Sequence, residues 1–338
     1  MICVPPPALS VVCPFFNEGS LIVGAARRMV ANLRDQLDSW ELILVNDGST
    51  DDGLIHLLSV LKELDEPRVR VISYPVNQGR GRALRTGIVA ATGTFIVTTE
   101  ADCSWGDDIV KRLFETISGH PDCDFVVASP HREGGGFVAV PTARVLLTRW
   151  GNRLISLFFR SGLTMHTGMT RAYRRDVIAP LRTLENGKEF HLEVLFKLVN
   201  LKFRYREIAA TLSWETRNQY QQKARARVID ANILKLVRTH LALVLMADPL
   251  RLFFNAMLAA FAVSLGFLSL ATYNLIVGRV SIFLALISLF FFLFGFLFIG
   301  FAVVLTRLRD QAVETWARDY PEWPPMRSMP AEIVRGGS

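Results

Sequence analysis

Short, continuously apolar runs alternate with amphipathic stretches over the first 130 residues of this 338-residue chain. The apolar runs are 9–15, 40–46, 69–74, 94–99 and 124–129. Runs that are apolar throughout, without alternation, are typical of strands covered on both faces, as in a parallel sheet. The stretches between them predict helices over 18–37, 51–64, 81–91 and 107–118, with Asp51 and Asp107 as candidate N-caps. The pattern therefore predicts an α/β fold with a doubly wound open sheet.

The pattern changes after Ser129. The sequence "PHREGGG" indicates a glycine-rich loop, and in 143–162 arginines are separated by apolar residues. This amphipathic stretch predicts an interfacial helix on a bilayer surface; a basic helix packed on the domain is the alternative. "FHLEVLFKLVN" predicts a further helix, and "FRYREIAATL" contains a predicted strand. Residues 228–245 predict a helix that leads into the next segment.

Two long segments, 252–278 and 280–306, contain no charged residue. Each exceeds the ~20 residues that a helix needs to cross a bilayer. Both are apolar all round, which favours a transmembrane hairpin over two buried helices of a soluble protein. Because the linker around Arg279 is short and basic residues crowd the segment before the first span, the positive-inside rule predicts that both large parts face the cytoplasm.

The expected organisation is a cytoplasmic domain (1–225), a juxtamembrane helix (226–251), two transmembrane helices (252–306) and a cytoplasmic tail (307–338). The N-terminal segment lacks a basic n-region and is broken by prolines, so a signal peptide is not expected. We therefore expect a multi-pass protein of the cell membrane. The four cysteines show no paired spacing, which fits reduced thiols, and Cys103 is expected to be a small filler residue instead of a nucleophile.

The net charge of +7 is concentrated in the second half of the chain. Between Arg144 and Arg182 there are eight arginines and a single acid, Asp176. Since no nucleic-acid-binding motif accompanies them and apolar spans follow, the expected partner is an anionic lipid headgroup or a lipid phosphate, and no nucleic acid.

Polar motifs follow four of the predicted strands or precede the helices after them. They are "PFFNE", "NDGSTDD", "NQGRGRA" and "EADCSW". Ligands of open α/β sheets bind beyond the carboxyl ends of the strands, so these loops are the candidate site. Glu100 and Asp102, two residues apart at a strand end, could hold a divalent cation; a solvated acid pair is the alternative. The chain has neither the glycine fingerprint of a Rossmann dinucleotide site after the first strand nor a P-loop.

The motifs "PFFNE", "ILVNDGSTDD", "NQGRGRALRTG" and "EAD", in this order and spacing, resemble those of the family 2 glycosyltransferases with the GT-A fold. Further motifs, among them "ASPHREGGG", "RVLLTRWGN", "TGMTRAYRRDV", "GKEFHLE" and "ATLSWETRNQYQQK", resemble the dolichyl- and polyprenyl-phosphate sugar synthases over roughly residues 9–225. The resemblance implies a GT-A type doubly wound mixed sheet (Rossmann-like), followed by interfacial helices and two transmembrane helices.

The implied activity is the metal-dependent, inverting transfer of a hexose from a nucleotide-diphosphate sugar to a polyprenyl phosphate. Glu100 and Asp102 would hold Mg²⁺ or Mn²⁺. The residues implied to bind the nucleotide sugar are Pro14, Phe16, Glu18, Asp47, Arg80, Asp102, Arg217 and Lys223. The implied catalytic residues are Asp102, Glu193 and Arg217. The residues implied to bind the acceptor phosphate are Arg132, Arg144, Thr148, Arg149 and Arg174.

Several of these residues have a simpler alternative reading. Asp47 could cap the helix after "DGST", Lys223 could form a surface salt bridge, and Glu193 could be an ordinary acid on a helix face. The chain also departs from the family pattern. Glu100 replaces the usual first aspartate of the acid motif, and Met165, followed by His166, stands where the family has another aspartate. A structural role is expected for His166.

Two other functions compete with this one. A processive polysaccharide synthase shares the N-terminal motifs but needs a Gln-x-x-Arg-Trp motif; Arg149–Trp150 follows "LLT" without the glutamine. A catalytically weak, sugar-nucleotide-binding membrane scaffold is the second alternative, and the altered acid motif is its support. The sugar, the nucleotide, the lipid length and the oligomeric state, a homo-oligomer included, are left open.

Overall fold

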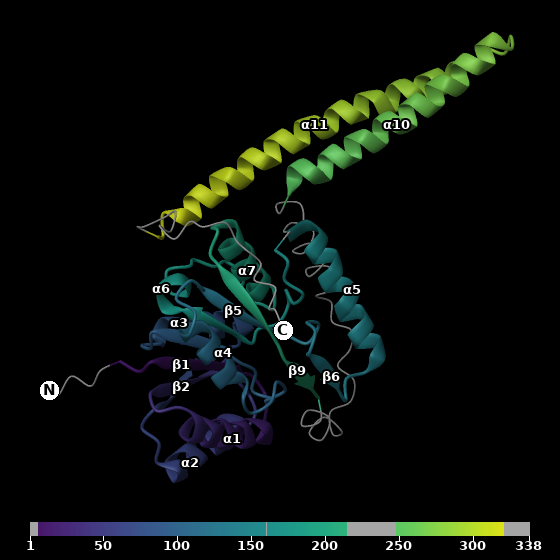
Figure 1. Ribbon diagram of the computed structural model, residues 1–338. Coiled ribbons are helices and arrows are strands. Elements are labelled where there is room, and N and C mark those ends of the chain that lie inside the picture. Colours follow the sequence, from purple (N-terminus) through teal and green to yellow (C-terminus); the bar gives the residue numbers. More distant parts are fainter. Residues whose placement is uncertain (1–5, 160, 215–247, 321–338) are drawn as a thin grey trace. The chain divides into compact units, whose positions relative to one another are not determined.

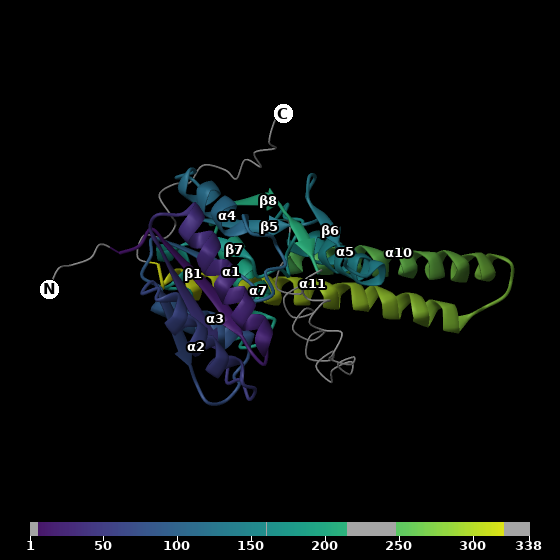
Figure 2. The ribbon, with the colours of Figure 1, turned by 90° about the horizontal axis from the view of Figure 1, so that it is seen from below.

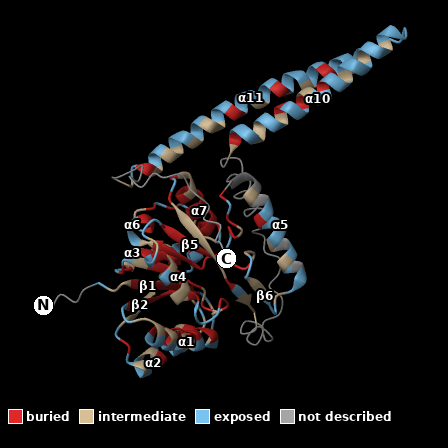
Figure 3. Cartoon of the chain, in the orientation of Figure 1, coloured by how far each residue is buried: buried red, intermediate tan, exposed pale blue. Residues whose placement is uncertain are grey.

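The computed structural model describes residues 6–159, 161–214 and 248–320. The chain divides into two compact units, one formed by Met1–Ile233 with Trp316–Ser338 and the other by Leu234–Thr315. Within the first unit, helices pack on a central sheet whose inner strands are buried, whereas the two edge strands are partly exposed (Figures 1 and 3).

The central sheet has seven strands in the order β3-β2-β1-β4-β7-β5-β8. Their bounds are β1 Leu9–Phe15, β2 Trp40–Asn46, β3 Val69–Ser73, β4 Phe95–Thr98, β5 Phe125–Ser129, β7 Arg171–Arg174 and β8 Tyr205–Ala209. All pairings are parallel except those of β7, which runs antiparallel to both β4 and β5. The sheet is therefore mixed, as expected, and the carboxyl ends of β1, β2 and β4 lie at one edge.

Helices cover both faces of this sheet, and a small second sheet flanks it (Figure 2). The helices of the domain are α1 Ser20–Gln36, α2 Gly53–Leu64, α3 Arg80–Ala90, α4 Ile109–Ser118, α5 Thr142–Phe159, α6 Arg175–Ile178 and α7 Phe190–Asn200. The second sheet pairs β6 Gly136–Val138 with β9 Thr211–Ser213 in parallel. The expected helix over 143–162 thus corresponds to α5.

The N-cap predictions at Asp51 and Asp107 are wrong, since α2 and α4 begin after Asp52 and Asp108. Asp51 instead accepts hydrogen bonds from the amides of Gly53 (3.1 Å) and Gly19 (2.8 Å). Asp107 binds the guanidinium of Arg28. Both acids therefore connect segments distant in sequence, which a local capping pattern does not reveal.

The second unit contains α10 Pro249–Ile276 and most of α11 Ile282–Ala317. Both helices are long and apolar enough to cross a membrane, and most of their side chains are exposed (Figure 3). Ser264 and Ser288 each donate a hydroxyl hydrogen bond to the other's carbonyl, which joins the two helices. The predicted helix over 228–245 lies outside the described residues.

The expected tail, 307–338, begins as helix because α11 continues to Ala317. The side chains of Trp316 and Tyr320 pack against aromatic rings of the first unit. Residues 316–320 of the tail are thus part of the first unit, whereas 307–315 belong to the second.

Candidate active site

Three acids lie in the loops that follow β1 and β4. The thiol of Cys13, fully buried near the end of that strand, has a pKa raised well above its usual value. Burial is the main cause, followed by electrostatic interactions with Cys103, Asp102, Glu18 and Glu100. Because β1 and β4 pair in parallel up to Val12 and Thr98, the loops that carry Glu18, Glu100 and Asp102 leave the sheet at the same end. The two loops therefore start from neighbouring strand ends, while a joint role of their acids stays a prediction.

The loop after β4 turns tightly, so that the carboxylates of Glu100 and Asp102 both accept hydrogen bonds from Ser104. The Ser104 amide donates to Asp102 Oδ1 (3.1 Å), and its hydroxyl donates to Glu100 Oε2 (3.4 Å). Cys103 adopts a left-handed conformation with φ of 49°, and its amide donates to the Glu100 carbonyl (3.4 Å). This turn is anchored to the second sheet, because the Ser213 amide donates to the Ser104 carbonyl (2.7 Å).

Arg80, at the first position of α3, faces the acid loop. Its guanidinium Nη1 lies 4.0 Å from Glu100 Oε1, and both side chains keep access to solvent. The guanidinium could bind an anionic ligand, and the two carboxylates beside it could hold a metal ion that the ligand shares. Among the described residues, no group of three or more His, Cys, Asp or Glu side chains forms a complete metal site. Two carboxylates alone suit Mg²⁺, which commonly takes one or two protein carboxylates and fills its other positions with water and substrate phosphate.

Asp47 organises the loop before α3. Its buried carboxylate accepts hydrogen bonds from the Tyr74 hydroxyl (2.8 Å), the Asn77 amide group (2.9 Å) and the backbone amides of Gln78 and Gly79 (2.9 and 3.0 Å). Gly48 permits this approach, since a Cβ there would lie 2.4 Å from the backbone of Val76 and Asn77. The alternative that Asp47 caps α2 is wrong; its contact with a nucleoside stays a prediction.

Glu193 is buried in the first turn of α7, where it fixes a neighbouring loop. Its carboxylate accepts from the amides of Leu184 (2.9 and 3.0 Å) and Glu185 (2.8 Å) and pairs with Lys197 Nζ (2.7 Å). This arrangement corrects the alternative of an acid on a soluble helix face. It gives Glu193 a structural task, while its expected place beside the donor sugar stays a prediction.

The predicted acceptor residues on α5 are accessible. Arg144 and Arg149 are exposed, and Thr148 lies one turn after Arg144 on the same helix face. The guanidinium of Arg144 stacks 4.6 Å from the centre of the Trp214 ring. Because Trp214 follows Ser213, which bonds to Ser104, this contact connects the first turn of α5 to the acid loop.

The charge of Arg149 contributes to a lowered pKa of His131. Burial chiefly, and then the charge of Arg149, lowers the pKa of that imidazole. Arg132, next to it, donates Nη1 to the Glu207 carbonyl. The described geometry thus commits Arg132 to the backbone, and a role in acceptor binding stays a prediction.

The assignment of Arg174 to the acceptor site is wrong. Arg174 pairs with Phe95 at the beginning of β4, whereas the acid loop follows the end of that strand. Its guanidinium donates to the carbonyls of Cys123 (2.8 Å) and His120 (3.4 Å) and lies 5.3 Å from the centre of the Phe95 ring. Arg174 therefore stabilises the sheet at the end of β4 that lies away from the acid loop.

The remaining predicted residues are partly described. Pro14 is buried in β1, while Phe16 and Glu18 are exposed in the loop after it. Arg217 and Lys223 lie outside the described residues, which before this gap end at Trp214.

Sequence reasoning missed a buried arginine beside the site. Arg171, on β7 opposite Thr98, is fully buried and donates to the carbonyls of His191 (2.9 Å) and His166 (2.6 Å). His166 is also fully buried, and desolvation lowers its pKa to about 4, with the Arg171 charge a smaller cause. The expected structural role of His166 is therefore supported. No local signal distinguishes Arg171 from the surface arginines around it.

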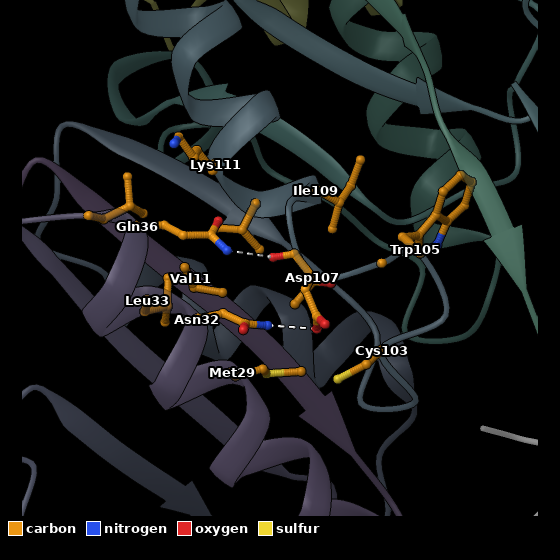
Figure 4. Close-up of a pocket in the computed structure, with 14 residues that line it drawn as sticks. Val11, Met29, Asn32, Leu33, Gln36, Cys103, Trp105, Asp107, Ile109 and Lys111 are labelled. Carbon is orange, nitrogen blue, oxygen red and sulfur yellow. Dashed lines mark hydrogen bonds between the residues drawn. The ribbon is translucent and has the colours of Figure 1, made fainter. Parts of the chain in front are cut away.

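A small pocket lies behind the acid loop, between α1 and α4 (Figure 4). Met29, Leu33, Trp105 and Cys103 are among its lining residues, and Asn32 donates to Asp107 Oδ1 (2.7 Å) at its rim. Burial raises the pKa of the Cys103 thiol to about 11. Such a thiol is protonated at neutral pH, which supports its assignment as a filler residue.

Comparison with known proteins adds relatives for this site. Dolichyl-phosphate beta-glucosyltransferase of Saccharomyces cerevisiae is 32% identical over 114 residues, which are 32% of this chain and 34% of the yeast protein. Undecaprenyl-phosphate 4-deoxy-4-formamido-L-arabinose transferase of Pseudomonas paraeruginosa is 28% identical over 186 residues, 54% of this chain and 51% of that protein. The chain thus matches about a third to a half of the length of these curated relatives.

Solved structures share the fold at low identity. Glucosyl-3-phosphoglycerate synthase of Mycobacterium tuberculosis, in complex with Mn²⁺, uridine diphosphate and phosphoglyceric acid, matches with a TM-score of 0.51 and 19% identity. The match covers 71% of this chain and 78% of that one. The same enzyme with Mg²⁺ and uridine diphosphate gives a TM-score of 0.50 at 18% identity, covering 71% and 78%.

A family assignment follows from the sequence itself. Residues 10–181, slightly more than half of the chain, match the family described as Glycosyl transferase family 2. The matched region contains all four strand-end motifs, the acid loop among them. The chain belongs to glycosyl transferase family 2.

Proposed function

We propose that this protein is a membrane-anchored, inverting glycosyltransferase that moves a hexose from a nucleotide-diphosphate sugar to a polyprenyl phosphate. The observation that carries the proposal is the short connection between the two halves of the site. The acid loop of Glu100 and Asp102 is bonded through Ser213 to the segment on which Arg144 stacks. One assembly therefore offers carboxylates for the donor's metal and arginines for an acceptor phosphate.

The donor half would bind the diphosphate through charge. Mg²⁺ or Mn²⁺, held by Glu100 and Asp102, would neutralise the leaving diphosphate. The hydrogen bonds from Ser104 orient both carboxylates, and Arg80 adds a positive charge 4.0 Å from Glu100. Arg217 and Lys223 are proposed to complete the diphosphate site. The complexes of the M. tuberculosis enzyme with Mn²⁺ or Mg²⁺ support a divalent cation.

The acceptor half needs no strong base, because a lipid monophosphate is already anionic at neutral pH. It needs positive charge that collects the phosphate and aims it at the anomeric carbon. The exposed Arg144 and Arg149 supply that charge, and an arginine fork can donate two hydrogen bonds to one phosphate. In-line attack would invert the anomeric configuration. The names of the yeast and Pseudomonas relatives support a polyprenyl-phosphate acceptor.

We further propose that α10 and α11 cross the cell membrane as a hairpin, with the catalytic unit on the cytoplasmic side. Their length and composition support the spans, and the short basic turn at Arg279 supports this orientation. Anchoring would hold the enzyme at the membrane, where a lipid phosphate is displayed.

The test is a transfer assay with the full-length chain in membranes. Radiolabelled UDP- and GDP-sugars are supplied in parallel, with undecaprenyl or dolichyl phosphate and with Mn²⁺, Mg²⁺ or EDTA. We expect one lipid-linked monosaccharide that disappears with EDTA and is absent from membranes without the protein. A long polymer would identify a processive synthase instead, and no lipid-linked product with any donor would favour a sugar-nucleotide-binding scaffold.

A further inference from the structure

Residues 316–320, which we name the docking segment, pack against α6, α7 and the residues beside them. The Trp316 ring meets the Phe196 ring edge to face, with centres 5.8 Å apart, and the Tyr320 ring meets Phe203 at 5.0 Å. The Tyr320 hydroxyl donates to the Val177 carbonyl (2.6 Å).

An ion pair adds to these contacts: Asp319 Oδ1 lies 3.0 Å from Arg182 Nε. The docking segment belongs to the same compact unit as the catalytic residues. Aromatic packing, a hydrogen bond and an ion pair together make a specific contact rather than a loose end of the chain.

Beneath Trp316 lies a buried ammonium group. Lys197 is 5% exposed, and its Nζ lies 5.2 Å from the centre of the Trp316 ring. The same ammonium pairs with Glu193 (2.7 Å) and donates to the Arg182 carbonyl (2.7 Å). A cation over an aromatic face is stabilised, and more strongly where water is excluded. Trp316 therefore shields the Glu193–Lys197 pair from solvent.

The Glu193–Lys197 pair holds a loop that supports α3. Glu193 fixes the amides of Leu184 and Glu185, and the carbonyl of Asn186, the next residue, accepts from the amides of Gly81 (2.7 Å) and Arg82 (3.3 Å). Packing at this junction is close: a Cβ at Gly79 would lie 2.4 Å from the Asn186 carbonyl oxygen.

The supported end of α3 carries Arg80, whose guanidinium lies 4.0 Å from Glu100. The contacts therefore run without interruption from Trp316 through Lys197, Glu193 and the 184–186 loop to the first turn of α3. We propose that the docking segment is a positioning element for the nucleotide-sugar site, in which Trp316 fixes Arg80 through the buried Glu193–Lys197 pair. This inference rests on the proposed function, since it assigns Arg80 to the donor.

The expected consequence is selective for the donor. Removing the indole lets water reach Lys197, weakens its hold on Glu193 and loosens the 184–186 loop. Arg80 then loses its fixed position, so donor binding weakens, while the α5 arginines that serve the acceptor are untouched. A residue that merely stabilised the fold would not separate the donor from the acceptor.

The test compares Trp316→Ala with wild type in the full-length chain. We expect the KM for the donor sugar to rise roughly fivefold to tenfold, with kcat and the KM for lipid phosphate changed less than about twofold. Trp316→Phe, which keeps an aromatic face, is expected to recover most of the donor affinity. Arg318→Ala, at an exposed neighbour within the docking segment, is the matched control and should behave as wild type. Equal effects on donor and acceptor would overturn the proposal.

A double-mutant cycle tests the route. If Trp316 acts through Lys197, the Trp316→Ala change should add little to the donor KM once Lys197→Met is present. Purely additive effects would contradict the route. Where Trp316→Ala unfolds the chain, Tyr320→Phe, which removes only the hydroxyl bond to Val177, should give a smaller rise in donor KM; no rise in that variant would count against the docking segment.

A binding measurement separates this inference from the proposed function. Thermal unfolding of each variant is followed with UDP or GDP and Mg²⁺, without any acceptor. If wild type binds nucleotide and Trp316→Ala binds it at least about fivefold more weakly, the positioning role stands even when no lipid-linked product forms. If both bind nucleotide equally well, or wild type binds neither nucleotide, the positioning role is refuted, whatever the transfer assay shows.

Discussion

At the scale of single residues, the site depends on acids whose partners come from elsewhere in the chain. The order of the strand-end motifs predicted that Glu18, Glu100 and Asp102 would meet, because parallel strands bring their carboxyl ends to one edge. The hydrogen bonds that fix Asp47 and Glu193 were not predictable, since their donors depend on how loops fold back. Arg174 was misplaced for a related reason: the sequence does not reveal that β7 runs antiparallel.

Asp102 is the residue on which the proposed chemistry most depends. Asp102→Asn keeps the size and the acceptor for the Ser104 amide but removes the charge that would hold a metal. We expect transfer to fall by at least about 100-fold in an assay of lipid-linked product. Glu115→Gln, at an exposed acid on α4, is the control and should retain full activity. Wild-type turnover of Asp102→Asn would remove Asp102 from the metal site.

Arg144 is expected to act on the acceptor alone. Arg144→Ala removes an exposed guanidinium from α5 and should raise the KM for polyprenyl phosphate about tenfold, with a much smaller change in donor KM. Arg175→Ala is a matched control, because Arg175 is an exposed arginine at the opposite edge of the sheet. An unchanged acceptor KM for Arg144→Ala would exclude it from the phosphate site.

At the scale of elements, the strands were largely predictable and the exceptions are instructive. The runs at 9–15 and 40–46 coincide with β1 and β2, because a strand buried on both faces is mostly apolar. The buried polar residues Ser10 and Glu41 bond to each other. β7 escaped the pattern, since its sequence "RAYR" looks like a surface segment although Arg171 is fully buried. The docking segment escaped for the same reason: polar residues surround Trp316 and Tyr320.

An ion-pair cluster joins α1, α2 and β3. The carboxylate of Glu66, 3% exposed, accepts from Arg68 and Arg34, and the bond to Arg68 is the main cause of a pKa lowered to about 2. A carboxyl whose pKa is lower in the folded state stabilises the fold above its unfolded pKa, and the gain is lost as the pH falls through the folded value.

Glu66→Gln should therefore lower the free energy of unfolding at pH 7 by roughly 2 kcal/mol. The deficit should shrink as the pH falls from about 4.5 to about 2, measured by denaturant unfolding of the purified chain. Glu63→Gln removes an exposed partner of Arg27 and should cost about 0.5 kcal/mol or less. A deficit independent of pH would show that shape, not charge, matters at Glu66.

The α10–α11 pair offers a second test. A Cβ at Gly295 would lie 2.3 Å from the Phe261 ring, whereas Gly300, on the same helix, has nothing within 4 Å. Gly295→Ile should force the two helices apart and destabilise the pair by about 1–3 kcal/mol, while Gly300→Ile should not. Resistance to SDS-induced unfolding in mixed micelles measures the difference. Equal behaviour of the two variants would mean that the helices do not pack at Gly295.

At the scale of the whole molecule, the sequence pattern predicted an α/β domain and two long apolar helices. It did not predict how the chain connects them. The uncharged segments 252–278 and 280–306 anticipated α10 and α11 closely, because such segments have no face for water. What composition could not indicate is that the last residues of α11 and those just after it, 316–320, belong to the folded domain and pack in it.

The position of the antiparallel strand β7 has a consequence for folding during synthesis. It fills the position between β4 and β5, so β4 has an open edge until roughly 75 more residues have been made, which takes about 4–15 s at ordinary rates of synthesis. During that interval the nascent chain exposes unpaired backbone groups, which invite aggregation. The need for chaperones should therefore be highest while the ribosome translates the residues between β4 and β7.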